Sequence, residues 1–110
     1  MTPEDLQKLE SAGVATDVVA GRVLIEHGQH ASGLYVVLDG TVLVEAPEGS
    51  REFGAGSVIG ERALFSEDGR RTARVTAATD VRLAAVGRVE VERLCADDES
   101  FAERLAAATQ

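Results

Sequence analysis

The sequence predicts a mainly β domain with flanking helices. We expect an eight-stranded β-jelly roll or barrel, with one helix before it, a short helix within it and helices after it. Between about residues 17 and 86, seven or eight short apolar runs alternate with glycines at regular spacing, a pattern typical of all-β barrels. On both sides of this region, apolar residues recur at helical spacing. The length fits one domain, so we assign residues 1–110 to a single unit.

The first expected element is a helix at about residues 3–12. Pro3 suits the first helical turn, and Thr2 can cap it. Leu6 and Leu9, three residues apart, would form its narrow apolar face. The glycine that follows ends the helix.

Short runs of β-branched and apolar residues predict the strands, and the turns predict how they connect. Asp39-Gly40 is the strongest hairpin signal in the chain, so the strands on either side of it are expected to pair with each other. Pro47–Ser50 predicts another turn. The expected strands are Val23–Ile25, Leu34–Leu38, Thr41–Val44, Arg51–Phe53, Val58–Ile59, Ala73–Ala77 and Val81–Val86.

Residues 88–108 return to helical spacing. The apolar positions are Val91, Leu94 and Cys95 at i, i+3 and i+4, and then Phe101, Leu105 and Ala108 at i, i+4 and i+7. Asp97 or Asp98 can cap the last helix. We interpret Phe101 and Leu105 as core residues in preference to a lid over a ligand.

The charge balance argues against one class of function. The net charge is −8 and Lys8 is the single lysine, so we expect no nucleic-acid binding, which depends on Lys and Arg neutralising phosphates. The ten arginines are scattered except for Arg70, Arg71 and Arg74. An anionic ligand would therefore have to bind at that cluster.

Cysteine usage and hydropathy indicate the compartment. Cys95 is the single cysteine, so no disulfide can form within the chain, which fits a reducing cytoplasm. We interpret Cys95 as a small core hydrophobe. No apolar run approaches the roughly 20 residues that span a membrane, and the N-terminus lacks the apolar segment of a signal peptide. We expect a cytoplasmic domain without membrane contact.

The most informative segment is residues 56–75. Gly60 opens a short turn, Glu61 follows it, and a small apolar helix-forming run comes next. An acidic loop then leads to a pair of arginines and to a strand with small residues. This segment offers backbone N–H groups for an anion, a carboxylate for hydroxyls and a guanidinium for a phosphate.

Residues 60–73 resemble the phosphate-binding cassette of cyclic nucleotide-binding domains, whose pattern is Gly-Glu-x-Ala-Leu, a loop, and then Arg-[Ser/Thr/Ala]-Ala. Residues 28–42 are similar to a second signature of this family, Gly-x-x-x-x-x-Leu-Tyr-x-Val-x-x-Gly, and residues 56–61 to Gly-Asp-x-[Phe/Ile]-Gly-Glu. The resemblance covers about residues 17–105, and its type is that of the catabolite activators and the regulatory subunit of cAMP-dependent kinase. The chain stops about where activator proteins begin a long dimerising helix, so we expect no DNA-binding domain.

The family's phosphate-binding arginine has two candidates here. Some members place it nine residues after the glutamate, which selects Arg70, and others ten, which selects Arg71. The downstream pattern Arg-Thr-Ala-x-Val fits only Arg71, which we assign to the phosphate. We expect Arg70 to be peripheral, and both arginines to lie on the surface.

The resemblance implies roles for further residues. Glu61 would accept a hydrogen bond from the ribose 2′-hydroxyl, and Thr72 would reach the base or the phosphate. Val44 and Arg51 would line the base. The full set of implied ligand-binding residues is Val44, Arg51, Ile59, Gly60, Glu61, Arg62, Ala63, Arg71, Thr72 and Ala73. Arg62 in place of an aliphatic residue and Ser57 in place of an aspartate depart from the family pattern.

The implied function is a sensor that binds a 3′,5′-cyclic mononucleotide and signals through its cassette and C-terminal helices. Cyclic AMP is the first candidate ligand, Thr72 favours cyclic GMP, and cyclic pyrimidine nucleotides are further candidates. A protein effector or a fused output domain would receive the signal. We expect no enzymatic activity, metal or cofactor, since no nucleophile, general base or phosphate-binding P-loop is visible.

Three alternatives stay open. The chain could be a degenerate copy of the fold that serves as a protein-interaction domain. It could be a cupin-like metalloprotein, although His27 and His30 have no third histidine beside them. Taken singly, Glu61 could be a solvated acid at a helix start, and Arg71 a surface partner of Glu67 or Asp68.

Overall fold

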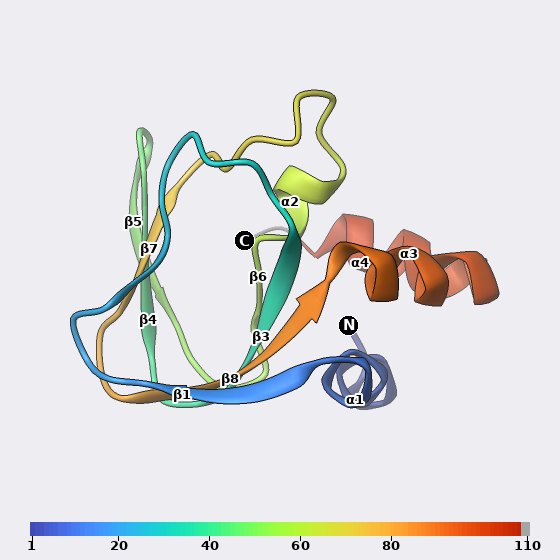
Figure 1. The fold of residues 1–110 in the computed structure, drawn as a ribbon, viewed down its shortest axis with the longest axis horizontal. Helices are drawn as coiled ribbons and strands as arrows, with labels where there is room; N and C mark the ends of the chain where they lie inside the picture. Colours follow the sequence, from blue (N-terminus) through green and yellow to red (C-terminus); the bar gives the residue numbers. More distant parts are fainter. Residues whose placement is uncertain (109–110) are drawn as a thin grey trace.

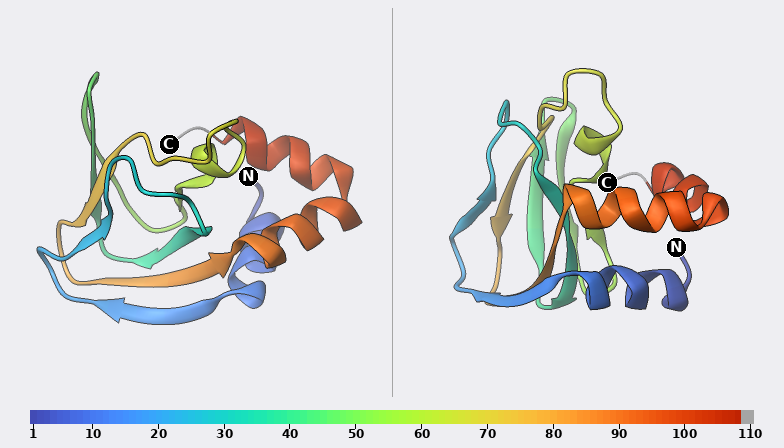
Figure 2. Two further views of the ribbon diagram at one scale, coloured as in Figure 1. Left: turned by 45° about the horizontal axis from the view of Figure 1, so that its top comes forward. Right: turned by 45° about the vertical axis from the view of Figure 1, so that its right-hand side comes forward.

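Eight strands and four helices make up residues 1–108, the part of the chain that the computed structural model describes. The strands form two sheets that curve into a barrel, and three of the helices gather at one side of it (Figure 1 and Figure 2). In chain order the elements are α1 (Pro3–Ala12), β1 (Val14–Val18), β2 (Val23–Ile25), β3 (Gly33–Asp39), β4 (Val42–Ala46), β5 (Gly49–Phe53), β6 (Val58–Ile59), α2 (Glu61–Leu64), β7 (Arg74–Ala77), β8 (Val81–Gly87), α3 (Arg88–Asp97) and α4 (Glu99–Ala107).

Both sheets are antiparallel and four-stranded. One has the order β1-β8-β3-β6 and the other β2-β7-β4-β5, so most neighbours in space are distant in the chain. Such long-range pairing of short strands is the arrangement of a jelly roll. The predicted mainly β, eight-stranded fold with flanking helices is confirmed.

The barrel begins earlier in the chain than the sequence predicted. β1 starts at Val14 instead of about residue 17, and it pairs with β8 along its whole length. The prediction missed this start because residues 14–17 are all exposed, so the strand shows no alternation of buried apolar side chains. Backbone pairing with β8 holds β1 at the edge of its sheet, helped by Val18, which packs on the barrel interior. At the other end, β8 runs to Gly87.

The strands on either side of Asp39-Gly40 do not pair, so the predicted hairpin is wrong. β3 pairs with β6 and β8, whereas β4 belongs to the other sheet and pairs with β5 and β7. Gly40 has a φ of 89°, and a Cβ there would collide with the carbonyl oxygen of Asp80. The carbonyl of Thr41 accepts the N–H groups of residues 78 and 79, so its hydrogen bonds go to the β7–β8 turn.

The two-residue hairpin joins β4 to β5 instead. Pro47 and Glu48 form its turn, and Ala46 faces Gly49 across the ladder. This turn lies within the predicted segment 47–50. Proline suits the position because its fixed φ favours a turn and its missing N–H is not needed by the ladder.

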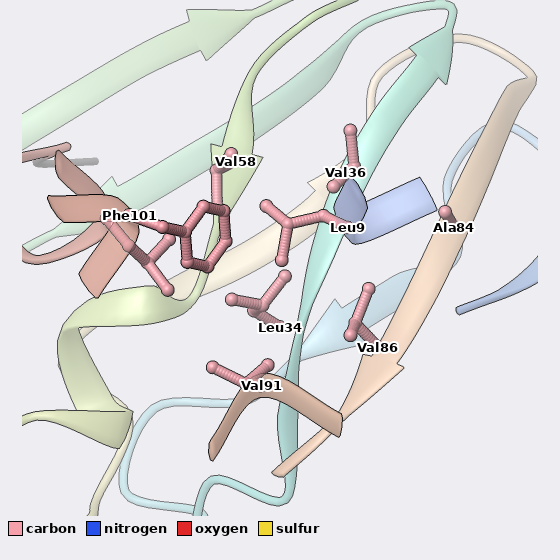
Figure 3. Packing of buried hydrophobic residues seen from close by; sticks show 9 residues of the cluster. Leu9, Leu34, Val36, Val58, Ala84, Val86, Val91 and Phe101 are labelled. Carbon is pink, nitrogen blue, oxygen red and sulfur yellow. The ribbon is translucent and has the colours of Figure 1, made fainter. Parts of the chain in front are cut away.

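Two hydrophobic clusters lie on opposite faces of the sheet that contains β3 and β8. The inner cluster fills the barrel and comprises Ile25, Val37, Val42, Val44, Ile59, Val75, Ala77, Val81 and Leu83. The outer cluster packs under the helices and comprises Leu9, Leu34, Val36, Val58, Ala84, Val86, Val91, Phe101 and Leu105 (Figure 3). Successive residues of a strand point to opposite faces, so β3 contributes to both clusters.

The helices α1, α3 and α4 cover the outer cluster. Thr2 caps α1 in a capping box with Asp5, and Asp98 caps α4 by accepting the N–H of Phe101 at 3.2 Å. Phe101 and Leu105 are fully buried in this cluster, which confirms the core interpretation. The half-buried Cys95 packs against the same cluster, as predicted.

Within residues 1–108, no helix is both long enough and apolar enough to cross a bilayer.

Candidate functional site

A hollow opens between β2, β4 and β7 on one side and the segment from β6 through α2 on the other. It is narrow, with a cavity volume of about 30 Å³. The structure brings eight of the ten predicted site residues to its lining: Val44, Ile59, Gly60, Arg62, Ala63, Arg71, Thr72 and Ala73. The remaining two, Glu61 and Arg51, lie elsewhere, as described below.

Gly60 shapes the entrance to the short helix α2. It follows β6 directly and has a φ of 91°, a conformation that L side chains rarely adopt. A Cβ at this position would also collide with Nη1 of Arg71. The glycine therefore allows both the turn into α2 and the close approach of the guanidinium.

Arg71 is held between two backbone segments. Its Nη1 donates to the carbonyl oxygen of Gly60 at 2.8 Å, and its Nη2 donates to that of Gly33 at 2.9 Å. The residue is only 8% exposed, so the expectation of a surface arginine is wrong. Burial lowers the pKa of the Arg71 guanidinium, while Tyr35 and Glu61 act in the opposite direction. The group stays cationic at neutral pH because arginine starts from so high a value.

Arg70 has different surroundings. It is exposed, its backbone N–H donates to Oδ1 of Asp68 at 3.1 Å, and its Nη1 donates to the carbonyl of Gly28 at 2.9 Å. That backbone hydrogen bond is the main cause that lowers the pKa of the Asp68 carboxyl. Asp68 thus interacts with Arg70, and of the two neighbouring arginines it is Arg71 that lines the hollow.

The loop between β2 and β3, residues 26–32, is hydrogen-bonded to the backbone of residues 69–71. The N–H of Gly28 donates to the carbonyl of Arg71 at 2.9 Å, and the N–H of Arg71 donates to that of Gln29 at 2.7 Å. The N–H of Ala31 donates to the carbonyl of Gly69 at 2.7 Å. These bonds fix the backbone of Arg71 on a second side.

Glu61 does not line the hollow. It is 1% exposed, and its negative charge is one of those that act on Arg71. A contact between this carboxylate and a ribose hydroxyl would therefore require the side chain to move. α2 has only four residues, so its dipole is short and Arg71 supplies the stronger positive potential.

A second hollow continues from the first toward the β4–β5 hairpin. The two share Val44, Arg62, Thr72 and Ala73, and the second has a cavity volume of about 350 Å³. Arg51 lies here, with its guanidinium 5.3 Å from the centre of the Phe53 ring. The second hollow has the volume of a small-molecule site, and the narrow first hollow adds an apolar wall with a few polar groups.

Some lining residues were missed by the sequence analysis. Ile25 and Val75 line the first hollow, and Glu48 and Phe53 line the second. The alternation of β7 was a usable signal for Val75, because it is buried while its neighbours on the strand are not. The contact between Arg71 and the carbonyl of Gly33 could not be predicted from the sequence. A backbone carbonyl is present at every residue, so only the path of the chain decides which one the arginine meets.

The two histidines lie on the β2–β3 loop. His30 forms an isolated β-bridge with Arg70. Across residues 1–108 we find no group of three or more His, Cys, Asp and Glu side chains that could hold a metal ion.

Comparisons with known proteins place this geometry in context. The family model described as cyclic nucleotide-binding domain matches residues 16–98. A cyclic nucleotide-gated potassium channel of Rhizobium etli is 35% identical over 88 residues, which cover 80% of this chain and 24% of the channel. The chain thus spans about a quarter of the length of that relative.

Solved structures share the fold over nearly the whole chain. One comes from work on a cyclic-GMP-dependent signalling pathway that regulates bacterial phytopathogenesis. Its TM-score is 0.85 at 27% identity, over 96% of this chain and 87% of that one. The catabolite activator protein of Thermus thermophilus has a TM-score of 0.81 at 26% identity, over 97% of this chain and 53% of that one.

Proposed function

The chain belongs to the cyclic nucleotide-binding domain family, and from this premise we propose that it binds a 3′,5′-cyclic mononucleotide in the two connected hollows. The observation that carries the proposal is the buried guanidinium of Arg71 at the lining of the first hollow. In a chain with a net charge of −8, this concentrates positive charge where an anion can reach it.

The ligand would use the two hollows for its two ends. The cyclic phosphate would lie against Arg71 and the backbone that follows Gly60, where charge-assisted hydrogen bonds are available. The base would extend along Val44 and Thr72 toward Arg51 in the second hollow. Cyclic AMP and cyclic GMP are both candidates, and the neighbour from a cyclic-GMP-dependent pathway supports including the second.

We propose a sensing role without catalysis. α2 lies against α4, and Leu64 of α2 packs on the outer cluster to which Phe101 of α4 belongs. A shift of α2 on ligand binding would therefore reach the C-terminal helices, as a sensor with two conformations requires. A protein effector or a fused output domain, working in the cytoplasm, would respond to that change.

Titration calorimetry and thermal unfolding with cyclic AMP, cyclic GMP, cyclic CMP and cyclic UMP test the proposal. We expect at least one to bind with a dissociation constant on the order of micromolar or below. At 100 times that concentration it should stabilise the fold by about 2.7 kcal/mol. Linear 5′-AMP and 5′-GMP are the controls, since they carry the same bases and ribose but a phosphate that is not cyclised. A panel without heat or melting shift at millimolar ligand would leave the interaction-domain alternative.

Thr72→Ala should change base preference more than phosphate affinity. The hydroxyl at the junction of the hollows can accept a hydrogen bond from the 2-amino group of guanine, which adenine lacks. We expect cyclic GMP to lose about 1 kcal/mol relative to cyclic AMP. Thr72→Ser retains the hydroxyl and should keep the parent ratio. An unchanged affinity ratio in Thr72→Ala, measured by calorimetry, would remove this residue from base discrimination.

A further inference from the structure

Arg88 joins the start of α3 to the β2–β3 loop. Its backbone N–H donates to the carbonyl oxygen of Ser32 at 2.8 Å, and its Nη2 donates to that of Ala31 at 3.0 Å. Its Nη1 lies 3.8 Å from Oε1 of Glu92, one turn further along the helix. The side chain thus reaches from the helix back to the loop.

Arg71 meets the same stretch of backbone. Its N–H donates to the carbonyl of Gln29 and its Nη2 donates to that of Gly33, so its bonds bracket the peptide groups that Arg88 holds. Ala31 links Arg88 to the segment that carries Arg71: its carbonyl accepts from the Arg88 side chain, and its N–H donates to the carbonyl of Gly69.

Two effects of Arg88 on the anion site oppose each other. Its positive charge disfavours the cation on Arg71 and lowers that pKa. Its hydrogen bonds fix the loop that orients Arg71. The Arg88 side chain is 41% exposed, so solvent screens the repulsion, whereas the bond to Ala31 is partly buried and charge-assisted. The positional effect should therefore dominate.

We propose that Arg88 is a positioning residue for the anion site. By holding the carbonyl of Ala31, it fixes the loop, and with it the carbonyl of Gly33 that orients the Arg71 guanidinium. The role in the loop stands on the geometry alone, and the role in ligand affinity rests on the proposed function.

Amide hydrogen exchange measured by NMR without ligand tests the first part. In Arg88→Met, the N–H groups of Gly28, Ala31 and Arg71 should exchange at least about tenfold faster, while those of β4 and β5 keep their parent rates. Arg88→Lys should restore part of the protection, because an ammonium can still donate to a carbonyl. Arg93→Met removes an exposed arginine from the same helix and should match the parent. Unchanged protection, or an equal increase at every amide, would overturn the proposal.

Calorimetry with cyclic AMP and cyclic GMP tests the second part. The affinity of Arg88→Met for the tighter of the two should fall by about 3- to 10-fold, with Arg88→Lys between it and the parent. Parent affinity together with faster loop exchange would overturn the positioning role. If the parent chain binds none of the four cyclic nucleotides, the proposed function fails, and the exchange rates still decide whether Arg88 holds the loop.

Discussion

Arg71→Ala is expected to weaken cyclic nucleotide binding by about 2–4 kcal/mol, on the order of 30- to 1,000-fold. The reason is the loss of a charge-assisted contact to an anion in a partly enclosed hollow. The variant should also lower the free energy of unfolding by about 1–3 kcal/mol, because the carbonyls of Gly60 and Gly33 both lose their guanidinium donor. Calorimetry and urea unfolding measure the two effects.

Two variants separate the charge of Arg71 from its geometry. Arg70→Ala removes the exposed neighbour and should cost far less in both measurements. Arg71→Lys keeps the charge but lacks the second nitrogen with which the guanidinium meets the two carbonyls, so it should regain part of the affinity and less of the stability. A larger loss of affinity in Arg70→Ala than in Arg71→Ala would contradict the assignment of the phosphate to Arg71.

Asp5→Asn is expected to lower the free energy of unfolding by about 2–4 kcal/mol. The Asp5 carboxylate is buried and accepts two hydrogen bonds from Arg104, from Nε at 2.7 Å and from Nη2 at 2.8 Å, which join α1 to α4. It also accepts the N–H of Thr2 in the capping box. Because the Arg104 side chain is 39% exposed, the cost stays below that of breaking a fully enclosed pair.

The same ion pair predicts a pH dependence. The hydrogen bonds from Arg104 are the largest cause that holds the pKa of Asp5 well below its ordinary value. A carboxyl whose folded pKa is depressed stabilises the protein above its unfolded pKa, near 3.9, and this contribution is lost as the pH falls below that value. The loss of stability between about pH 5 and 2 should therefore be smaller in Asp5→Asn than in the parent.

Asp17→Asn is the matched control for Asp5. Asp17 pairs with Arg82 at 3.2 Å, but both side chains are more than half exposed. Exposed ion pairs contribute little, so this variant should cost less than about 1 kcal/mol in urea unfolding. Equal losses in the two variants would mean that burial of the Asp5–Arg104 pair has no special weight.

Local signals predicted most elements of this fold. The first helix, its Thr2 cap and the fold class followed from turn chemistry and periodicity, which depend on neighbours in sequence. The Asp39-Gly40 hairpin failed because a turn signal says where a strand ends and not which sheet the next strand joins. The start of β1 was not predicted, because an exposed edge strand carries no apolar pattern.

The candidate site shows the same division. The motif from Gly60 to Ala73 was sufficient to predict six of the residues that line the first hollow, because they lie in one short segment whose glycine permits the turn into α2. The burial of Arg71 depends on its contact with the carbonyl of Gly33 in β3, 38 residues away, and the burial of Glu61 depends on the packing of α2 against β3. The Asp5–Arg104 pair joins residues 99 apart, which no local pattern can indicate.

The alternation of β3 has a practical consequence for redesign. Leu34 and Val36 pack against the helices, whereas Val37 faces the barrel interior together with Leu83 of the neighbouring strand. A combinatorial library restricted to the inward positions would vary the side chains that fill the barrel, while those packed against the helices keep their parent identity. A library at the outward positions would do the reverse. The single sheet thus acts as a partition whose two faces can be engineered as separate modules.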